Sequence, residues 1–201
     1  MASGNGVALL VVDVQQGAVD RGPWRAAELM GNIASLIAAC RGSGVEVVYV
    51  QHDGKPGEDE EPGTPGWEIA ADIRPGPGER VVRKRFNSAF RETDLRAYLE
   101  DRGVGTLLVV GIQTEYCVDT TIRVAFEHGF EVVVPEMTNS TFDSGGLTAA
   151  QIHHLINRRI LAGRFARAMS LEETRSLVAE AGRGRQAMRG GERHPCCDQG
   201  I

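Results

Sequence analysis

Unbroken apolar runs alternate along the chain with segments of helical periodicity. The runs at residues 7–12 and 106–111 are rich in Val and Leu and contain no charged residue. Such runs are typical of strands that are buried on both faces of a parallel sheet. The same reasoning, applied to shorter apolar stretches, predicts strands at residues 7–12, 45–50, 81–84, 106–111, 131–135 and 165–169.

Helices are predicted between these strands. The clearest one starts at Pro23, repeats apolar residues at helical spacing, and stops at Gly42 and Gly44. Ser170 and Glu173 have the spacing of a capping box, so a last helix is expected from Ser170 to residue 181. The full set of expected helices covers residues 23–41, 94–102, 117–128, 145–160 and 170–181.

Strands and helices that alternate with short connections predict the fold class. We expect an α/β protein, doubly wound and three-layered, with a mainly parallel six-stranded sheet. One long segment interrupts the alternation, because residues 53–79 hold five of the eight prolines and an acidic run. A short helical turn is expected at residues 67–70. The remainder is either a lid over a functional site or a solvated surface excursion.

Composition places the chain among ordinary globular proteins. It has 201 residues, of which 42% are apolar and 24% are charged, and its formal net charge is −5. We expect a single domain over residues 1–181 and a disordered basic tail over residues 182–201. The negative charge argues against a general nucleic-acid or membrane-surface binder. No apolar run approaches the roughly 18 residues of a membrane span, and residues 1–6 do not resemble a signal peptide, so we expect a cytoplasmic protein.

Cysteine usage agrees with a reducing compartment. The four residues, Cys40, Cys117, Cys196 and Cys197, have neither a zinc-type spacing nor the pattern of a disulfide framework. Each is therefore expected as a free thiol, which is either a small core residue or a reactive group.

Candidate chemistry lies where the expected strands end, because ligands of open parallel sheets collect at the carboxyl edge. Asp13, His52, Lys84 and the turn at 111–117 all lie there. Cys117 opens an expected helix, a setting that lowers a thiol pKa and favours a nucleophile. The alternatives are a buried apolar Cys117, an Asp13 that caps the next turn, and a solvated Lys84 among neighbouring arginines.

Three segments together carry a family resemblance. They are residues 9–16 (LLVVDVQQ), residues 82–90 (VRKRFNSAF, continuing to Thr-Asp-Leu at 93–95) and residues 111–121 (GIQTEYCVDTT). In this order, the chain resembles the isochorismatase-like cysteine hydrolase superfamily, which includes nicotinamidases, N-carbamoylsarcosine amidases and streptothricin hydrolase. The resemblance runs from residue 7 to about residue 181.

The resemblance implies a set of site residues. It implies a catalytic triad of Asp13, Lys84 and Cys117. A cis peptide bond between Ile112 and Gln113 would help the backbone N–H groups of Gln113 and Cys117 to form an oxyanion hole. Second-rank candidates for the substrate pocket are Gln15, His52, Trp67 and Phe86. His153 and His154 are expected on a helix surface or at an interface.

Departures from the family pattern narrow the expected substrate. Gln51-His52-Asp53 stands where nicotinamidases carry an Asp-x-His metal element, so no metal and no other cofactor is expected and nicotinamide is not favoured. Ala18 replaces a usual phenylalanine and would widen the pocket. Gln113 and residues 53–66 look most like the streptothricin-hydrolase-like branch, which suggests a lactam or a small cyclic amide.

The expected function is hydrolysis of the C–N bond of a small-molecule amide or lactam through a Cys117 thioester. Alternatives are an isochorismatase-type vinyl-ether hydrolase, a redox-sensing protein that uses Cys117, and a non-catalytic binding module on the same fold. Leu147, Ile152 and Leu155 remain as spare apolar residues. Together with the resemblance, they suggest a homo-oligomer, either a dimer or a tetramer.

Overall fold

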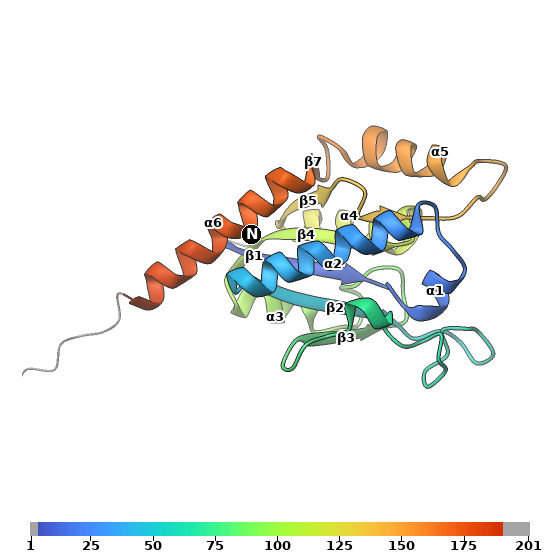
Figure 1. Ribbon diagram of the computed structural model, residues 1–201, viewed down its shortest axis with the longest axis horizontal. Coiled ribbons are helices and arrows are strands. Elements are labelled where there is room, and N and C mark those ends of the chain that lie inside the picture. Colours follow the sequence, from blue (N-terminus) through green and yellow to red (C-terminus); the bar gives the residue numbers. More distant parts are fainter. Residues whose placement is uncertain (1–3, 191–201) are drawn as a thin grey trace, which may run out of the picture.

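A computed structural model describes residues 4–190 and shows a parallel sheet flanked by helices (Figure 1). Its strands are β1 (Gly6–Val12), β2 (Glu46–His52), β3 (Arg80–Lys84), β4 (Val104–Ile112), β5 (Glu131–Pro135), β6 (Asn139–Ser140) and β7 (Arg167–Met169). Its α-helices are α1 (Gln16–Asp20), α2 (Ala26–Ser43), α3 (Leu95–Asp101), α4 (Asp119–Glu127), α5 (Ala149–His154) and α6 (Leu171–Gly190). A 3-10 turn, η1 (Ala71–Ile73), and two π-helical segments, η2 (Thr114–Val118) and η3 (Leu155–Leu161), complete the chain.

The sheet confirms the expected fold class. Six strands run in the order β3-β2-β1-β4-β5-β7 and every neighbouring pair is parallel, while the two-residue β6 pairs with the end of β4. The chain builds outward from β1 to β3 on one side and from β4 to β7 on the other. The order therefore reverses between β1 and β4, the position at which open α/β sheets bind ligands.

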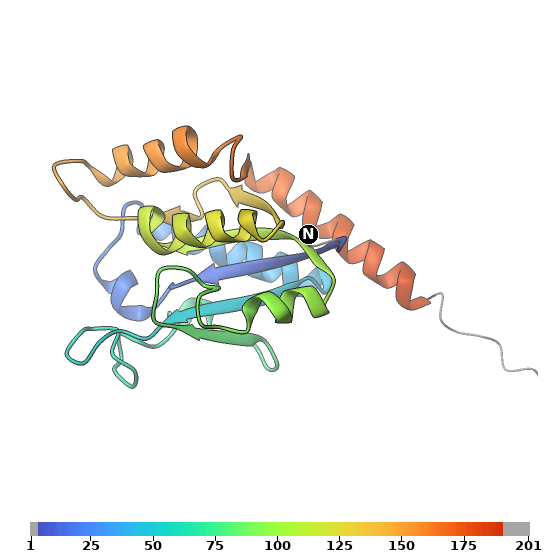
Figure 2. The same ribbon diagram turned by 180° about the vertical axis from the view of Figure 1, so that it is seen from behind.

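Helices cover both faces of the sheet. Helices α2 and α6 pack on one face (Figure 1), and α3 and α4 pack on the opposite face (Figure 2). The residues of β1 alternate between the two cores, so Leu10 and Val12 pack with α3 and α4, whereas Leu9 and Val11 pack with α2. This two-sided burial is why the strand is a continuous apolar run rather than an alternating one.

The C-terminal helix differs from its expected length. The capping box forms, since Ser170 Oγ accepts from Glu173 N at 3.2 Å and Glu173 Oε2 accepts from Ser170 N at 2.8 Å. Helix α6 then continues beyond residue 181 to Gly190. An established helix extends without a new nucleation step, so a segment with little apolar periodicity can remain helical. Residues 191–201, including Cys196 and Cys197, lie outside the described residues.

Other differences concern short elements. Residues 67–70 are not helical, since Ile69 forms an isolated antiparallel bridge with Gln15, and the 3-10 turn η1 follows them. Neither α1 nor β6 was expected, and both are too short to show a period. The helix predicted at 145–160 is divided into α5 and η3. Ile152 is buried against the body of the protein, so only Leu147 and Leu155 of the three spare apolar residues are exposed. Within residues 4–190, no helix is long and apolar enough to cross a membrane.

Candidate active site

The carboxyl ends of β1, β3 and β4 bring three distant residues together. Asp13 follows β1, Lys84 is the last residue of β3, and Cys117 lies in η2 just after β4. Strands β1 and β4 lie very close together at this edge. A Cβ atom on residue 111 would be only 1.9 Å from the Val12 carbonyl oxygen, so no residue larger than glycine fits there. Glycine at 111 therefore allows β4 to turn toward η2 directly beside Asp13.

Lys84 is the centre of the group. Its Nζ atom lies 2.6 Å from Asp13 Oδ2 and 3.3 Å from Cys117 Sγ. A third contact, at 3.4 Å, joins Nζ to His52 Nδ1. The Lys84 side chain is fully buried and that of Asp13 is 9% exposed. The three residues that the resemblance named as a triad thus lie within contact distance around one ammonium group.

The backbone at the site is unusual at two places. Asp13 has a φ of 52°, in the left-handed region that non-glycine residues seldom adopt. The peptide bond between Ile112 and Gln113 is cis. The carbonyl oxygen of Gln113 accepts hydrogen bonds from Tyr116 N and Val118 N, both at 3.2 Å. These bonds shape the turn on either side of Cys117.

A cavity of about 210 Å³ opens beside the sulfur. Of the expected residues, Asp13, Gln15, Ala18, His52, Gln113 and Cys117 line it. Lys84 does not line this cavity. It is buried beneath the cavity wall, where it contacts both Asp13 and Cys117. The small side chain of Ala18 forms part of the wall, at the place where a phenylalanine would fill space.

Gln15 is almost fully buried and ties the edge of the site together. Its Nε2 atom donates to the carbonyl oxygens of His52 and Trp67, at 3.0 and 2.9 Å, and its Oε1 atom accepts from His52 N at 2.8 Å. The Gln15 amide thereby fixes the end of β2, and with it the His52 ring that contacts Lys84.

Trp67 and Phe86, two expected pocket residues, are not among the residues that line this cavity. The Trp67 indole donates to Asp53 Oδ1 at 3.0 Å and lies under the Arg83 guanidinium. Phe86 lies under Arg91, whose guanidinium carbon is 3.7 Å from the ring centroid. Both rings thus contact arginines outside the cavity beside Cys117. Trp67 contributes only through its backbone carbonyl, which binds Gln15.

Five residues that the sequence analysis did not predict as pocket residues complete the cavity wall: Arg21, Glu60, Asn87, Ile112 and Tyr116. Arg21 follows α1 and donates to Glu60 Oε1 at 2.8 Å. Glu60 belongs to the acidic run of the 53–79 segment, so that segment reaches the cavity. Asn87 Oδ1 lies 3.9 Å from Cys117 Sγ. The only sequence feature that could have indicated Asn87 as a site residue is its position three residues after Lys84 in the VRKRFNSAF segment.

The thiol departs from the expected electrostatics. Burial and the adjacent Asp13 carboxylate raise the pKa of Cys117 to about 12, although Lys84 opposes them. Cys117 lies inside η2 rather than at the start of α4, and one ammonium already neutralises one carboxylate. A second anion there is unfavourable. The expected low thiol pKa is therefore wrong for the resting site, which holds a neutral thiol.

Lys84 keeps its charge. Burial alone would lower the pKa of Lys84, but the charge of the Asp13 carboxylate and the hydrogen bonds to Asp13 and Cys117 outweigh burial and raise it. The resting site is thus a thiol beside an ammonium–carboxylate pair.

The residues at the metal-element position are each engaged elsewhere. Gln51 Nε2 donates to the Trp67 carbonyl at 2.8 Å, the His52 ring contacts Lys84, and Asp53 pairs with Arg83 at 2.9 Å. Within the described part of the chain, no group of three or more His, Cys, Asp or Glu side chains is placed to hold a metal ion.

Comparisons with known proteins agree with this geometry. The sequence model of the isochorismatase domain matches residues 7–173. A streptothricin hydrolase of Streptomyces noursei is 43% identical over 138 residues, which are 68% of this chain and 50% of that protein. A ureidoacrylate amidohydrolase of Variovorax paradoxus is 32% identical and 69% of each chain is covered. The solved structure of an isochorismatase from Pseudomonas putida matches with a TM-score of 0.79 and 29% identity, covering 83% of this chain and 89% of that one.

The chain spans only part of some of these relatives. It covers about half the length of two streptothricin hydrolases, 50% of one and 55% of the other.

Proposed function

Because this chain belongs to the isochorismatase family, we propose that it is a cysteine hydrolase that cleaves the C–N bond of a small amide or lactam through a thioester on Cys117. The observation that carries the proposal is the buried contact of one ammonium, Lys84 Nζ, with both Asp13 and Cys117. An acid, an ammonium and a sulfur from three distant parts of the chain have no packing reason to converge.

Because the pKa of the Cys117 thiol is high, the proposed mechanism needs a base that removes the thiol proton at the moment when sulfur attacks the substrate. Loss of the Cys117 proton to water would leave two anions beside one cation. Transfer of that proton to Asp13 instead leaves a single anion, the sulfur, next to Lys84. The charge of the site does not change in this transfer, so Asp13 is the proton acceptor that the surroundings favour.

The proposed reaction has two halves. Sulfur attacks the carbonyl carbon while Asp13 takes the thiol proton, and the carbonyl π electrons move to oxygen. When this intermediate collapses, the C–N bond breaks and Asp13 protonates the leaving nitrogen. Water then attacks the thioester with Asp13 as base, the carboxylic acid leaves, and the proton returns to sulfur. We assign the oxyanion to the backbone N–H groups of Gln113 and Cys117.

The cavity supports a small substrate. Its volume of about 210 Å³ lies below the roughly 300–1,000 Å³ of pockets for drug-sized ligands. Only a compact acyl group, or the reacting end of a longer molecule, fits beside Cys117. The relatives named for streptothricin and for ureidoacrylate make lactams and ureido compounds the first classes to try.

A substrate panel tests the reaction class. Small amides, cyclic lactams, ureido acids and a vinyl ether are incubated with the protein, and the products are identified by mass spectrometry. The proposal expects a carboxylic acid and an amine or ammonia from at least one C–N substrate. Turnover of the vinyl ether alone would replace it with the isochorismatase-type alternative. If no substrate turns over while Cys117 forms a reversible sulfenic acid, the redox-sensing alternative is favoured.

We also propose a homo-oligomer. Leu147 and Leu155 are 44% and 43% exposed, and both lie on the segment that carries α5 and η3. Sedimentation velocity of the wild type and of a Leu147→Ser, Leu155→Ser double variant tests this assignment. A faster-sedimenting species in the wild type alone supports it.

A further inference from the structure

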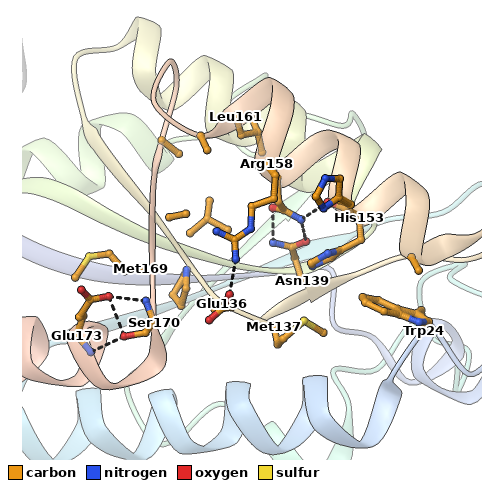
Figure 3. Close-up of a pocket in the computed structure, with 18 residues that line it drawn as sticks. Trp24, Glu136, Met137, Asn139, His153, Arg158, Leu161, Met169, Ser170 and Glu173 are labelled. Atoms are coloured by element: carbon orange, nitrogen blue, oxygen red, sulfur yellow. Dashed lines mark hydrogen bonds and ion pairs between the residues drawn. The ribbon is translucent and has the colours of Figure 1, made fainter.

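A second cavity, more than twice the volume of the catalytic one, lies between the α5–η3 segment and the ends of β5 and β7 (Figure 3). Its volume is about 540 Å³, within the usual range for small-molecule sites. We propose that it binds an uncharged, single-ring aromatic molecule that carries one hydrogen-bonding group. We further propose that this ligand is coupled to the turn that holds Cys117.

The apolar part of the wall favours a flat ring. Trp24, Met137, Met169 and Leu161 line the cavity, and Trp24 and Met137 lie together at one end of it (Figure 3). The Trp24 and His153 rings are 5.1 Å apart and tilted by 52°. Aromatic edges and thioether sulfurs both pack well against aromatic rings.

The polar part of the wall favours a neutral ligand. Arg158 of η3 meets Glu136 at the end of β5 in an ion pair (Figure 3). Glu173 is occupied by the capping bonds from Ser170, at 2.8 Å. Because Arg158 and Glu136 neutralise each other and Ser170 engages the Glu173 carboxylate, the wall offers little that favours a charged ligand over a neutral one.

His153 supplies a hydrogen-bonding position. Its Nε2 atom is buried and has no hydrogen-bond partner among the described residues. Burial, with Arg158, His154 and Arg25 nearby, lowers the pKa of His153, so its ring is neutral near pH 7. A buried polar atom without a partner is costly. A turn of the imidazole that brings Nε2 to the cavity wall would let one hydroxyl or amide group of the ligand satisfy it.

A chain of buried hydrogen bonds joins this cavity to the nucleophile turn. Asn157 and Asn139, which both line the cavity, exchange amide hydrogen bonds at 2.9 and 3.0 Å. Asn139 Oδ1 also accepts from Thr114 Oγ1 at 2.8 Å. Thr114 is the first residue of η2, the turn that contains Cys117. Asn157 Nδ2 donates to the His153 carbonyl at 3.0 Å, so the chain begins at the proposed ligand position.

The two tryptophans of the chain report on the two regions separately. Trp24 lines the second cavity, whereas Trp67 is hydrogen bonded to Asp53 in the segment near the catalytic site. Phenol, benzoate and benzylamine are titrated into the full chain while both indole N–H signals are followed by NMR. We expect phenol to shift the Trp24 signal with a dissociation constant on the order of 1 mM and to leave Trp67 unchanged. Benzoate and benzylamine should bind about tenfold more weakly or less.

Two matched variants locate the binding. Ala168→Leu fills the cavity from β7, and Ala38→Leu adds the same side chain at an exposed position of α2 outside it. Phenol affinity should fall about tenfold or more in the first variant and stay unchanged in the second. The binding proposal is overturned if phenol moves both indole signals alike, if Trp24 does not respond at tens of millimolar, or if Ala168→Leu binds as the wild type does. It is equally overturned if crosslinking with mass spectrometry places residues of a second copy of the chain inside the cavity.

The coupling is measured by thiol reactivity. It bears on the proposed function only if Cys117 is the nucleophile, whereas binding does not depend on that role. Alkylation of the Cys117 peptide by iodoacetamide is followed by mass spectrometry with and without phenol. We expect the rate to change by about 5-fold or more. Thr114→Val removes the bond to Asn139, so phenol should still shift Trp24 in this variant but no longer alter the rate. An unchanged rate in the wild type, or the same change in Thr114→Val, overturns the coupling.

Discussion

The two cavities differ in volume and in how far the ion pair at each is exposed to solvent. Beside Cys117, an ammonium and a carboxylate are paired with their side chains 0% and 9% exposed, next to a cavity of about 210 Å³ that the carboxylate lines. In the second cavity, the pair of Arg158 and Glu136 is 53% and 51% exposed, and the space is about 540 Å³. A buried pair is costly to form and costly to break, whereas an exposed pair contributes little. The proposed chemistry therefore uses a buried pair beside the smaller cavity, whereas the pair in the larger cavity lies at a solvated edge.

The largest expected effect is on the nucleophile. Cys117→Ala should reduce hydrolysis by about 10⁴-fold or more, because no other group forms the thioester. Cys40→Ala is the matched control, since Cys40 is a buried free thiol of the opposite core cluster. Steady-state rates of the two variants on any substrate from the panel test this. Equal losses in both would mean that Cys117 acts through packing.

The next effect separates the two roles of Asp13. Asp13→Asn should slow hydrolysis by about 10²–10⁴-fold, because the general base is lost. The same change removes the negative charge that raises the pKa of Cys117 and leaves Lys84 as the dominant neighbour. The thiol pKa should therefore fall from about 12.

The pH dependence of Cys117 alkylation measures that pKa. In the wild type, the alkylation rate should keep rising with pH toward 12, and in Asp13→Asn the rise should occur at lower pH. An unmoved profile, or one that moves upward, contradicts the assignment of Asp13 as the neighbouring anion.

Breaking the ion pairs gives a smaller effect and a direct comparison of the two regions. Lys84→Met leaves the Asp13 carboxylate buried without a counterion, so we expect a loss of about 3–5 kcal/mol in the free energy of unfolding. Urea denaturation at neutral pH measures this. A loss as small as that of a surface pair would show that water reaches Asp13.

Arg158→Met is the matched change in the second cavity and the smallest expected effect. An exposed pair is worth about 1 kcal/mol or less, so the free energy of unfolding should change by no more than that. Hydrolysis by Arg158→Met should stay within about twofold of wild type, because the residue does not line the catalytic cavity. A stability loss equal to that of Lys84→Met would remove the distinction between the regions.

The sequence predicted some features of the smaller cavity correctly and others incorrectly. Asp13, His52, Lys84 and the turn before Cys117 were identifiable because each ends an apolar strand, and parallel strands end at one edge. The thiol pKa was predicted in the wrong direction, since the sequence does not reveal that Asp13 and Cys117 share a single ammonium. Trp67 and Phe86 were second-rank pocket candidates on the family resemblance, but their rings contact Arg83 and Arg91 outside the cavity.

Contacts between loops could not be predicted either, because they leave no periodic pattern in the sequence. Arg21 and Glu60 meet across 39 positions of sequence without any periodic signal. The second cavity depends on where η3 lies relative to β7, and a periodicity that predicts one continuous helix at 145–160 does not show its division into α5 and η3.

Intact-protein mass spectrometry of the chain, quenched in acid during turnover of an amide or lactam, tests the central claim most directly. The account predicts a mass increase equal to the acyl half of the substrate, located on the Cys117 peptide and missing from Cys117→Ala. Turnover without any acyl adduct, or an adduct that persists in Cys117→Ala, would contradict it.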